Sequence, residues 1–547
     1  MLTKQNKKVS RQLYLPVKTK LYIFFLLISA SVLSQNDAQQ TFLNTDLNNL
    51  IDAYYIKYPT ETFHSSMKPY IGFGIKEVSD TAFHINNYKL KNQFMVNDFR
   101  SDPKYKNKFS LQVLPQLDEQ IGYDGAAKRT VNELSGGAYV RLDINSNFSA
   151  AITAIGGQVS YPSFTDTVTS KYKIIPGLGR AHGSNGVYTF ANFTGYISYS
   201  PIKNLNFQLA KDKIFIGDGY RSLLLSDVAN SYPFLKTTIN IWHLQYSFWY
   251  SCMQDVYSAS NGIRKNPLNR FGTFHYLSWN VTKNFNFSFF ETEIFQGTDS
   301  IRHRGFDPNY LNPLILFRPV EYSLGSGDNA LLGFNTSLKF AKHFKVYGQL
   351  IIDEFNWQYI KAQTGWWANK QGIQVGGKYV NAFGVKNLSL QAEYNWVRPY
   401  TYSHASEQQN YSQYNQPLAD PFGANFSEIL GFISYKHKNW QVDIKGMFTL
   451  VGRDTSGRGS SDVGQNIFLN YDLHNHTFGN FVGQGVKYNI MQGEFKFTYF
   501  LIRGLNLRLE VGVIERYTRA ESIGYSSATP YVYAGIKTSM YNFYRDY

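Results

Sequence analysis

The sequence predicts an all-β protein, an outer-membrane antiparallel β-barrel of 16 or 18 strands with a short helical lumen plug and long extracellular loops. Three observations support this fold: a composition rich in strand and turn formers, a recurring polar turn, and strands with one apolar and one charged face. The 547 residues include 42 Tyr, 42 Phe and 43 Gly, and only 17% are charged. This mixture favours strands and turns over helices. The mean hydropathy of −0.33 is too low for a helical membrane protein.

Residues 1–34 are typical of a signal peptide. Six basic residues precede the apolar run Leu21–Leu33, no acidic residue occurs before Asp37, and small side chains at Val32 and Ser34 favour cleavage near Ser34. The run is too short to span a bilayer, so we expect a cleaved signal rather than an anchor. Its removal lowers the formal charge from +15 to +9. A weak charge without a basic cluster argues against nucleic acid as a partner.

A short polar turn followed by an alternating strand recurs seven times. The turns start at Asn147, Lys203, Lys283, Lys342, Lys386, Lys438 and Arg503. Asn and Gly accept the left-handed backbone that tight hairpins require. The intervals vary from 44 to 80 residues, which excludes a solenoid repeat, and each holds two strands and a longer loop. Short turns at one end and long loops at the other are typical of outer-membrane barrels, whose short turns are periplasmic.

Strand faces favour a membrane barrel over a soluble sandwich. In 505–513, Leu and Val occupy one face, and Asn506, Arg508 and Glu510 occupy the other. Lipid outside and a wet lumen inside fit this pattern. Sixteen strands are expected, starting near 109, 147, 204, 284, 343, 386, 439 and 505 in one direction and near 134, 187, 271, 329, 371, 425, 484 and 528 in the other.

Residues 237–251 form one more extended, aromatic segment. Two strands are already assigned between the turns at 204 and 284. A third would leave the barrel with an odd number of strands unless the chain first returns through the lumen. Residues 217–236 could make this return, with Gly217 and Gly219 turning the chain inward and Arg221–Ala229 forming a short helical plug. The alternative is an 18-strand wall with another short strand, for example within 81–100.

The final strand is expected to run to Tyr547, because residues 531–547 alternate with many aromatics. This stretch resembles the terminal strand that the outer-membrane assembly machinery recognises. We therefore expect that machinery and outer-membrane lipid as partners. Three regions follow: a signal peptide at 1–34, an N-terminal periplasmic or plug-associated segment at 35–108, and the transmembrane barrel at 109–547.

Catalytic signatures are missing, so we expect no enzyme, no cofactor and no metal site. The sequence has no nucleophile elbow, zinc-protease motif, phosphate loop or dinucleotide fingerprint. The single cysteine, Cys252, excludes internal disulfides and a Cys-ligated metal.

Two groups of residues are candidates for binding a glycan, because sugars need aromatic faces beside planar hydrogen-bonding groups. Trp366 and Trp367 lie in a loop beyond the expected interfacial aromatic belt, and loop packing is the alternative role. The loop 304–328 could fold over the mouth of the barrel. Its candidate polar residues are Arg304, Asp307, Arg318 and Glu321. A network of these charges that merely orders the loop is equally open.

A third group of charged residues is expected to be structural. Asp212, Asp218, Arg221 and Asp227 would anchor the plug to the lumen wall. Asp443, Lys445, Arg508 and Glu510 fall on inferred inward faces and would pair across strands.

Three stretches of the sequence resemble a known family. "LAKDKIFIGDGYRSLLLSDVANSYPF" (209–234) resembles the Wzi-type capsule-assembly family, although Ala210 stands where a glycine is expected. Together with "HSSMKPY" (64–70) and "RGFDPNYLNPLILFRPVEYSLGSGDNALLG" (304–333), it looks more like the RemB-type gliding-motility proteins of the Bacteroidetes, relatives of that family.

The resemblance implies a non-enzymatic barrel at the cell surface of a Gram-negative bacterium. Its role would be gliding motility, attachment of capsular or other surface polysaccharide, or both, with polysaccharide, adhesins or motility proteins as partners. The alternative is a porin-like channel. The leucine-rich plug counts against that alternative, and a measured conductance would count for it.

Overall fold

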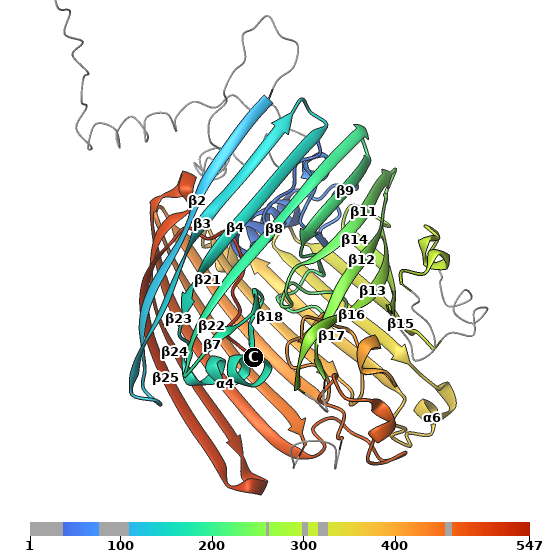
Figure 1. Ribbon diagram of the computed structural model, residues 1–547. Coiled ribbons are helices and arrows are strands. Elements are labelled where there is room, and N and C mark those ends of the chain that lie inside the picture. Colours follow the sequence, from blue (N-terminus) through green and yellow to red (C-terminus); the bar gives the residue numbers. More distant parts are fainter. Residues whose placement is uncertain (1–36, 76–108, 259–261, 298–304, 316–326, 455–461) are drawn as a thin grey trace, which may run out of the picture.

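The structure is a closed antiparallel β-barrel (Figure 1). This computed structural model describes residues 37–75, 109–258, 262–297, 305–315, 327–454 and 462–547, and within them 18 strands form the wall. The strands follow one another around the barrel in chain order, and β25 (Tyr525–Lys537) pairs with β2 (Phe109–Asp124) to close it. The predicted all-β barrel is confirmed, with the larger of the two expected strand numbers. The predicted signal peptide lies outside the described residues.

The remaining wall strands differ in length around the barrel. They are β3 (Arg129–Ile144), β4 (Phe148–Val159), β8 (Val187–Ile202), β9 (Leu205–Asp212), β11 (Tyr232–Ile241), β12 (Leu244–Ser258), β13 (Gly262–Asn280), β14 (Phe285–Gln296), β15 (Asn329–Phe340), β16 (Phe344–Glu354), β17 (Lys370–Val380), β18 (Leu388–Val397), β21 (Phe426–His437), β22 (Trp440–Arg453), β23 (Val486–Ile502) and β24 (Leu507–Ala520). β2, β3 and β8 have 16 residues each, whereas β14 to β18 have between 10 and 12. Sixteen of the 18 correspond to strands expected from the sequence, and β11 and β12 are the other two.

Side chains of the wall alternate between the outside and the lumen. On β8, Phe193 and Ile197 point outward and are 56% and 51% exposed, whereas Thr194 and Ser198 face the lumen and are buried. On β24, Glu510 is likewise buried in the lumen. An apolar exterior around a polar interior is the pattern of a barrel surrounded by lipid. The chain is therefore an outer-membrane β-barrel, with its short turns on the periplasmic side.

Residues 237–251, predicted as one strand, belong to two. β11 and β12 form a hairpin whose turn is Trp242-His243. Trp242 has a φ of +58°, the left-handed conformation that such turns need. The prediction missed this turn because it contains neither Asn nor Gly. The turn restores an even number of crossings, so the expected return of the chain through the lumen is wrong.

Residues 213–231 fill the lumen between β9 and β11, which pair directly with each other. We call this segment the plug. It contains no helix, so the helix predicted at Arg221–Ala229 is wrong. The Ser222 hydroxyl accepts the amide N–H groups of Leu224 (3.1 Å) and Leu225 (3.2 Å). Such local side-chain bonds compete with helical hydrogen bonds.

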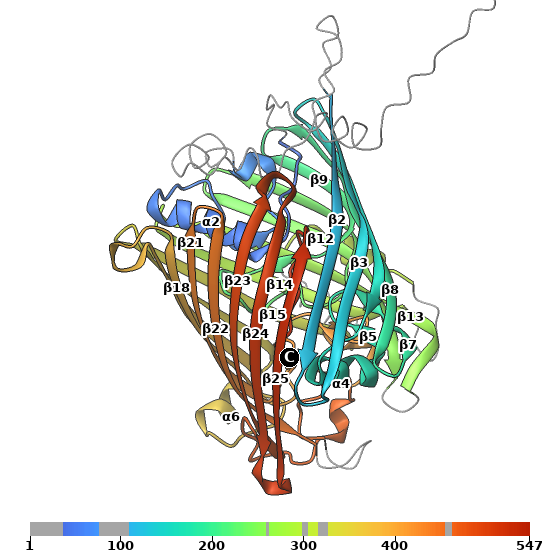
Figure 2. The same ribbon diagram turned by 90° about the vertical axis from the view of Figure 1, so that its left-hand side faces the viewer.

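The described part of the N-terminal segment, residues 37–75, lies at the short-turn end of the barrel, where Figure 2 shows α2 (Thr45–Lys57). Its helix is capped by Asn44, whose side chain accepts the Leu47 amide. β1 (Met67–Lys68) pairs with β10 (Phe215–Ile216) of the plug, so the two segments form one lumen filling.

The remaining short elements lie in loops and in the lumen. They are α4 (Ser163–Tyr172), α6 (Trp357–Lys361), β5 (Ile174–Ile175), β6 (Gly179–Arg180), β7 (His182–Ser184), β19 (Ser412–Gln413), β20 (Gln416–Pro417) and the 3₁₀ turns η1 (Gly72–Ile75), η3 (Pro308–Leu311), η4 (Ala382–Gly384), η5 (Glu407–Gln409), η6 (Tyr471–Leu473), η7 (Arg503–Leu505) and η8 (Glu521–Ile523). Among the described residues, no helix is both long enough and apolar enough to cross a bilayer.

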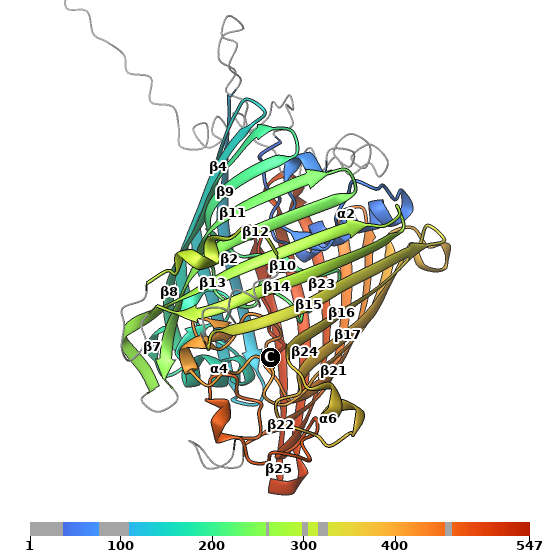
Figure 3. The same cartoon turned by 90° about the vertical axis from the view of Figure 1, so that its right-hand side faces the viewer.

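The last strand ends at Lys537, so the prediction that it continues to Tyr547 is wrong. Residues 538–547, which we call the tail, turn into the lumen, and the chain end lies inside the barrel in Figures 1 and 3. The Thr538 amide still donates to the Leu117 carbonyl oxygen of β2 at 2.8 Å. Among the tail aromatics, Tyr544 is only 9% exposed.

Candidate functional site

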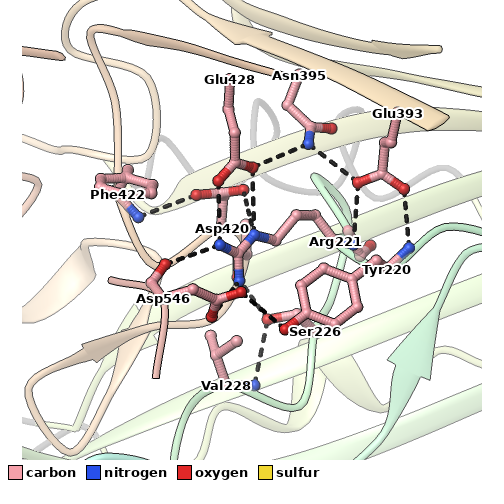
Figure 4. A network of polar contacts seen from close by, with 12 residues as sticks. Tyr220, Arg221, Ser226, Val228, Glu393, Asn395, Asp420, Phe422, Glu428 and Asp546 are labelled. Atoms are coloured by element: carbon pink, nitrogen blue, oxygen red, sulfur yellow. Dashed lines mark hydrogen bonds and ion pairs between the residues drawn. The ribbon is translucent and has the colours of Figure 1, made fainter. Parts of the chain in front are cut away.

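The centre of the lumen is occupied by an ion-pair network around Arg221 of the plug (Figure 4). Arg221 is 1% exposed, and its guanidinium donates to both carboxylate oxygens of Glu428 on β21, at 3.0 and 3.2 Å. It also contacts Asp546 of the tail at 3.2 Å and Asp420 of the loop 398–425 at 3.7 Å. One cation thus joins the plug, the wall, an outer loop and the tail.

Carboxylates outnumber cations in this network. Lys445 on β22 pairs with Glu494 at 2.9 Å and with Asp546 at 3.2 Å. Glu393 on β18 accepts the amide N–H groups of Tyr220 (2.8 Å) and Arg221 (3.1 Å). Two basic side chains therefore face five acidic ones.

The pKa values of the loop carboxyl Asp420 and the tail carboxyl Asp546 are shifted in opposite directions by this network. Burial, and then the charge of Glu428, raise the pKa of Asp420 well above its usual range. Burial would also raise the pKa of Asp546, but Arg221 and Lys445 outweigh it and hold that pKa below its usual range. Asp546 is therefore the carboxylate that the cations bind, and Asp420 tends to keep its proton.

A second network fixes the plug at the short-turn end. Lys345 on β16 is fully buried and contacts both Asp218 of the plug and Asp52 of α2 at 2.6 Å. Asp218 also accepts the Ser65 hydroxyl at 2.6 Å, and Lys378 on β17 pairs with Asp52 at 2.9 Å. These contacts fasten the plug and the N-terminal segment to the same part of the wall.

Asp227 connects the plug to the tail. Its carboxylate accepts the Tyr544 hydroxyl at 2.6 Å and the Asn542 amide at 2.9 Å. Asp212, grouped with the plug in the sequence analysis, is instead the last residue of β9 and accepts the amide of Lys213 at 2.8 Å.

Outer loops cover the plug from the long-loop end. Leu223, Leu224 and Leu225 are fully buried. The hydroxyl groups of Tyr402 and Tyr411, both in the loop 398–425, donate to the carbonyl oxygens of Leu223 (2.8 Å) and Leu224 (2.6 Å). The leucines of the plug therefore lie beneath a layer of tyrosines.

The inward charges predicted on the last strands pair both across strands and along one strand. Lys496 on β23 contacts Asp443 on β22 at 3.4 Å, as predicted, whereas Arg508 contacts Glu510 at 2.6 Å within β24. Lys537 also reaches Glu510 at 3.4 Å. Lys445, predicted with this group, belongs to the Arg221 network described above.

Residues 305–315 of the loop 304–328 lie on the outer face of the wall beside β12 and β13, not over the mouth (Figure 3). We call residues 305–315 the strap. Tyr246 and Tyr250, on outward positions of β12, donate to the carbonyl oxygens of Pro313 (2.6 Å) and Leu311 (2.7 Å). Tyr310 is fully buried and stacks on Phe295 of β14, with ring centroids 4.7 Å apart. The predicted position over the mouth is wrong for this part of the loop.

The strap explains why polar side chains can occupy the outer face here. His275, Glu291 and Glu293 lie on outward positions of β13 and β14, yet each is at most 1% exposed. Ionisable groups facing lipid are costly, and the strap shields this face of the wall. Among the candidate residues, Asp307 caps η3 by accepting the Asn309 amide at 3.0 Å. Arg304, Arg318 and Glu321 lie outside the described residues.

Trp366 and Trp367 hold two outer loops together. The Trp367 ring stacks on His474 at 4.3 Å and lies 5.0 Å from Tyr471, measured between ring centroids. Trp366 lies 5.0 Å from Tyr359. Both tryptophans are partly exposed. They pack between loops and remain partly exposed, and their role in binding a glycan stays a prediction.

The sequence analysis missed the tail and the loop acid Asp420 as members of the central network. Asp546 was assigned to a strand because the aromatics around it alternate. The charged pair Arg545-Asp546 interrupts that aromatic stretch, and this was the available signal. Asp420 carries no recognisable pattern, because its partner Arg221 is about two hundred residues away in the chain.

Comparisons with known proteins leave the family open. No protein-family model matches the sequence, and no curated protein matches it. Similar solved structures include Pseudomonas aeruginosa OprD, at 10% identity and a TM-score of 0.42 over 81% of this chain and 98% of that chain. Acinetobacter baumannii OccAB2 has 7% identity and a TM-score of 0.43 over 78% and 97%. Pseudomonas aeruginosa OccK8 (OprE) has 8% identity and a TM-score of 0.42 over 78% and 97%.

Similarity at this level carries no argument about what this chain binds or transports. The resemblance to the Wzi-type and RemB-type proteins stays a prediction, carried by the sequence stretches quoted above.

Proposed function

We propose that this chain is a porin-like outer-membrane channel that its own plug, tail and loops hold closed. The supporting observation is the way in which the plug, the tail and the N-terminal segment are attached to the wall. Side-chain hydrogen bonds and ion pairs, such as Arg221–Glu428 and Lys345–Asp218, join them to it. A wall of 16 to 18 strands is wide enough for an aqueous channel once such contacts are broken.

Conductance in planar bilayers tests this proposal. The wild-type protein should be closed for most of the time, and Arg221→Met should show discrete openings because it removes the cation that joins four segments. Arg519→Met is the matched control, since Arg519 is 54% exposed at the long-loop end and contacts Glu521. If Arg221→Met folds, as shown by heat-modifiable migration on gels, and still shows no openings, the channel proposal is wrong.

A second candidate function is handling of surface polysaccharide, alone or in gliding motility. The aromatic surface formed by Trp366, Trp367, Tyr471 and His474 favours it, together with the resemblance noted in the sequence. Arg398 donates to the Trp366 carbonyl oxygen at 3.2 Å, so a guanidinium contacts the backbone of this loop. Rings next to planar hydrogen-bonding groups suit a sugar.

Binding of the producing cell's own surface polysaccharide to the detergent-folded protein tests this second function. Saturable binding that Trp366→Ala weakens at least tenfold supports it. Trp242→Ala, which changes an exposed tryptophan at the opposite end of the barrel, should leave binding unchanged. Absence of binding by the wild type would remove this candidate.

A further inference from the structure

The tail is held in the lumen as a bound peptide would be. Apart from Thr538, no residue of 538–547 makes a backbone-to-backbone hydrogen bond with the described part of the chain. Side chains make the contacts instead, notably Asp546 with Arg221 and Lys445, and Tyr544 with Asp227. A segment fixed in this manner is not part of the hydrogen-bonded wall.

The cradle for the tail is built by separate parts of the chain. The plug supplies Tyr220, whose hydroxyl donates to Asp546 at 2.8 Å, and the guanidinium of Arg221, which also donates to the Asp546 carbonyl oxygen at 2.9 Å. The wall supplies two further cations. Lys445 on β22 donates to the Asp546 carboxylate at 3.2 Å, and the guanidinium of Arg516 on β24 donates to the Tyr547 carbonyl oxygen. Arg221 and Arg516 are 1% and 5% exposed. These donors select a carboxylate, which lies in the tail between Arg545 and Tyr547.

The cradle does not need the tail for its charge balance. Without Asp546, the three cations of the cradle, Arg221, Lys445 and Arg516, still stand against four acidic residues, Glu393, Glu428, Glu494 and Asp420. The tail therefore adds the Asp546 carboxylate to a site in which acidic residues already outnumber basic ones, and its own Arg545 pairs outside that site with Glu133 at 2.7 Å. Repulsion from the acidic residues of the site opposes the attraction of the cations and limits the net affinity.

We propose that the lumen contains a peptide-binding site that the tail occupies in cis, and that a segment of a periplasmic partner with an aspartate among aromatic residues takes the same place. The direction of entry follows from β25, which ends at the short-turn, periplasmic side before the chain turns inward. The Thr45 hydroxyl at that end contacts Asn542 at 3.0 Å. This inference concerns binding and stands apart from the channel proposal, because it requires no conductance.

An exchange experiment tests the site. A protease site is inserted between Lys537 and Thr538, the full chain is folded, and it is then cut. Fluorescent peptide of the sequence TSMYNFYRDY should displace the cut segment and bind saturably. The Asp546→Asn peptide should bind at least 30-fold more weakly, because it leaves Arg221 and Lys445 without that charge. The Phe543→Ala peptide is the control and should bind within threefold of the parent, since Phe543 is 39% exposed.

A second measurement avoids the cut. Met540 is 2% exposed, so a thiol reagent should label Met540→Cys slowly in a Cys252→Ser background. Added peptide should accelerate this labelling at least tenfold, and the Asp546→Asn peptide should not. If the cut segment never exchanges and peptide leaves the labelling rate of the intact chain unchanged, the tail is a permanent part of the core and the proposal is wrong.

Discussion

The hydroxyl group of Tyr246 donates to the Pro313 carbonyl oxygen at 2.6 Å, although Tyr246 lies on the outward face of β12. The same hydroxyl contacts His275 on the neighbouring strand. A backbone carbonyl beside a lipid-facing wall needs a donor, because hydrocarbon offers none. Tyr246 and Tyr250 supply two such donors, so the strap is part of the outer wall and not a lid.

Removing the anchor of the strap should destabilise the barrel. Tyr310→Ala takes away a fully buried ring, and we expect a loss of about 3–5 kcal/mol in the free energy of unfolding. Tyr310→Phe removes only the hydrogen bond to Asp328, at 2.8 Å, and should cost about 1 kcal/mol. Urea unfolding in detergent micelles measures both. Leu311→Ala is the control, since Leu311 is 49% exposed, and an equal loss there would contradict the role of Tyr310.

A larger side chain at Gly333 should displace the plug. A Cβ atom on Gly333 would overlap Cδ2 of Leu224, which is fully buried. Gly333→Val should therefore cost about 1–3 kcal/mol through overpacking and make the plug more accessible. Hydrogen exchange of residues 213–231 reports this change. Gly431→Ala on β21 meets no atom within 4 Å and should leave the exchange unaltered. Unchanged protection in Gly333→Val would contradict the contact.

Acid should weaken the attachment of the N-terminal segment through His64. Burial lowers the pKa of His64 to about 3, and its ring contacts Ser278 at 2.8 Å. In the unfolded chain the imidazole takes up a proton near pH 6.5, whereas in the folded chain it stays neutral until about pH 3. The free energy of unfolding is therefore unaffected by His64 above about pH 6.5 and decreases as the pH drops toward 3. Thermal unfolding between pH 7 and 4 measures the slope. His64→Gln should flatten it, and the exposed His182→Gln should not.

Loss of Lys345 should release the N-terminal segment from the wall. Lys345→Met leaves Asp52 and Asp218 buried without their shared cation, and we expect a cost of about 3–5 kcal/mol. Limited proteolysis should then cut within residues 37–75 at least tenfold faster. The exposed Lys203→Met provides the comparison. Equal resistance in Lys345→Met and wild type would mean that the remaining contacts, such as Lys378 with Asp52, suffice.

Periodicity and turn chemistry made most of the wall predictable. Alternating faces and Asn- or Gly-bearing turns located 16 strands, because a hairpin depends on neighbouring residues. The turn at Trp242-His243 escaped prediction, since its left-handed residue is a tryptophan and not the Asn or Gly that usually takes this conformation. The charged residues that face the lumen were predicted only from their alternating positions along each strand.

The contents of the site were less predictable, because long-range contacts decide them. Arg221 was expected to anchor the plug, but its partners Glu428 and Asp546 lie more than two hundred residues further along the chain. The tail alternates like a strand, yet the wall closes through β2 without it. The strap was predicted to lie over the mouth because a polar and aromatic composition does not distinguish a loop that covers the mouth from one that packs on the outer face of the wall.

The unequal strand lengths have a consequence for the surrounding bilayer. At about 3.3 Å per residue, the 16 residues of β2 extend roughly 50 Å along the strand and the 10 to 12 residues of β14 to β18 roughly 35 Å. The apolar band therefore has different heights on opposite sides of the barrel. A flat membrane matches such a perimeter only if the barrel axis leans or the lipid thins beside the short strands, which costs a fraction of a kcal/mol per ångström of mismatch. The protein is thus expected to deform the membrane on one side and to collect there lipids that tolerate a thinner layer.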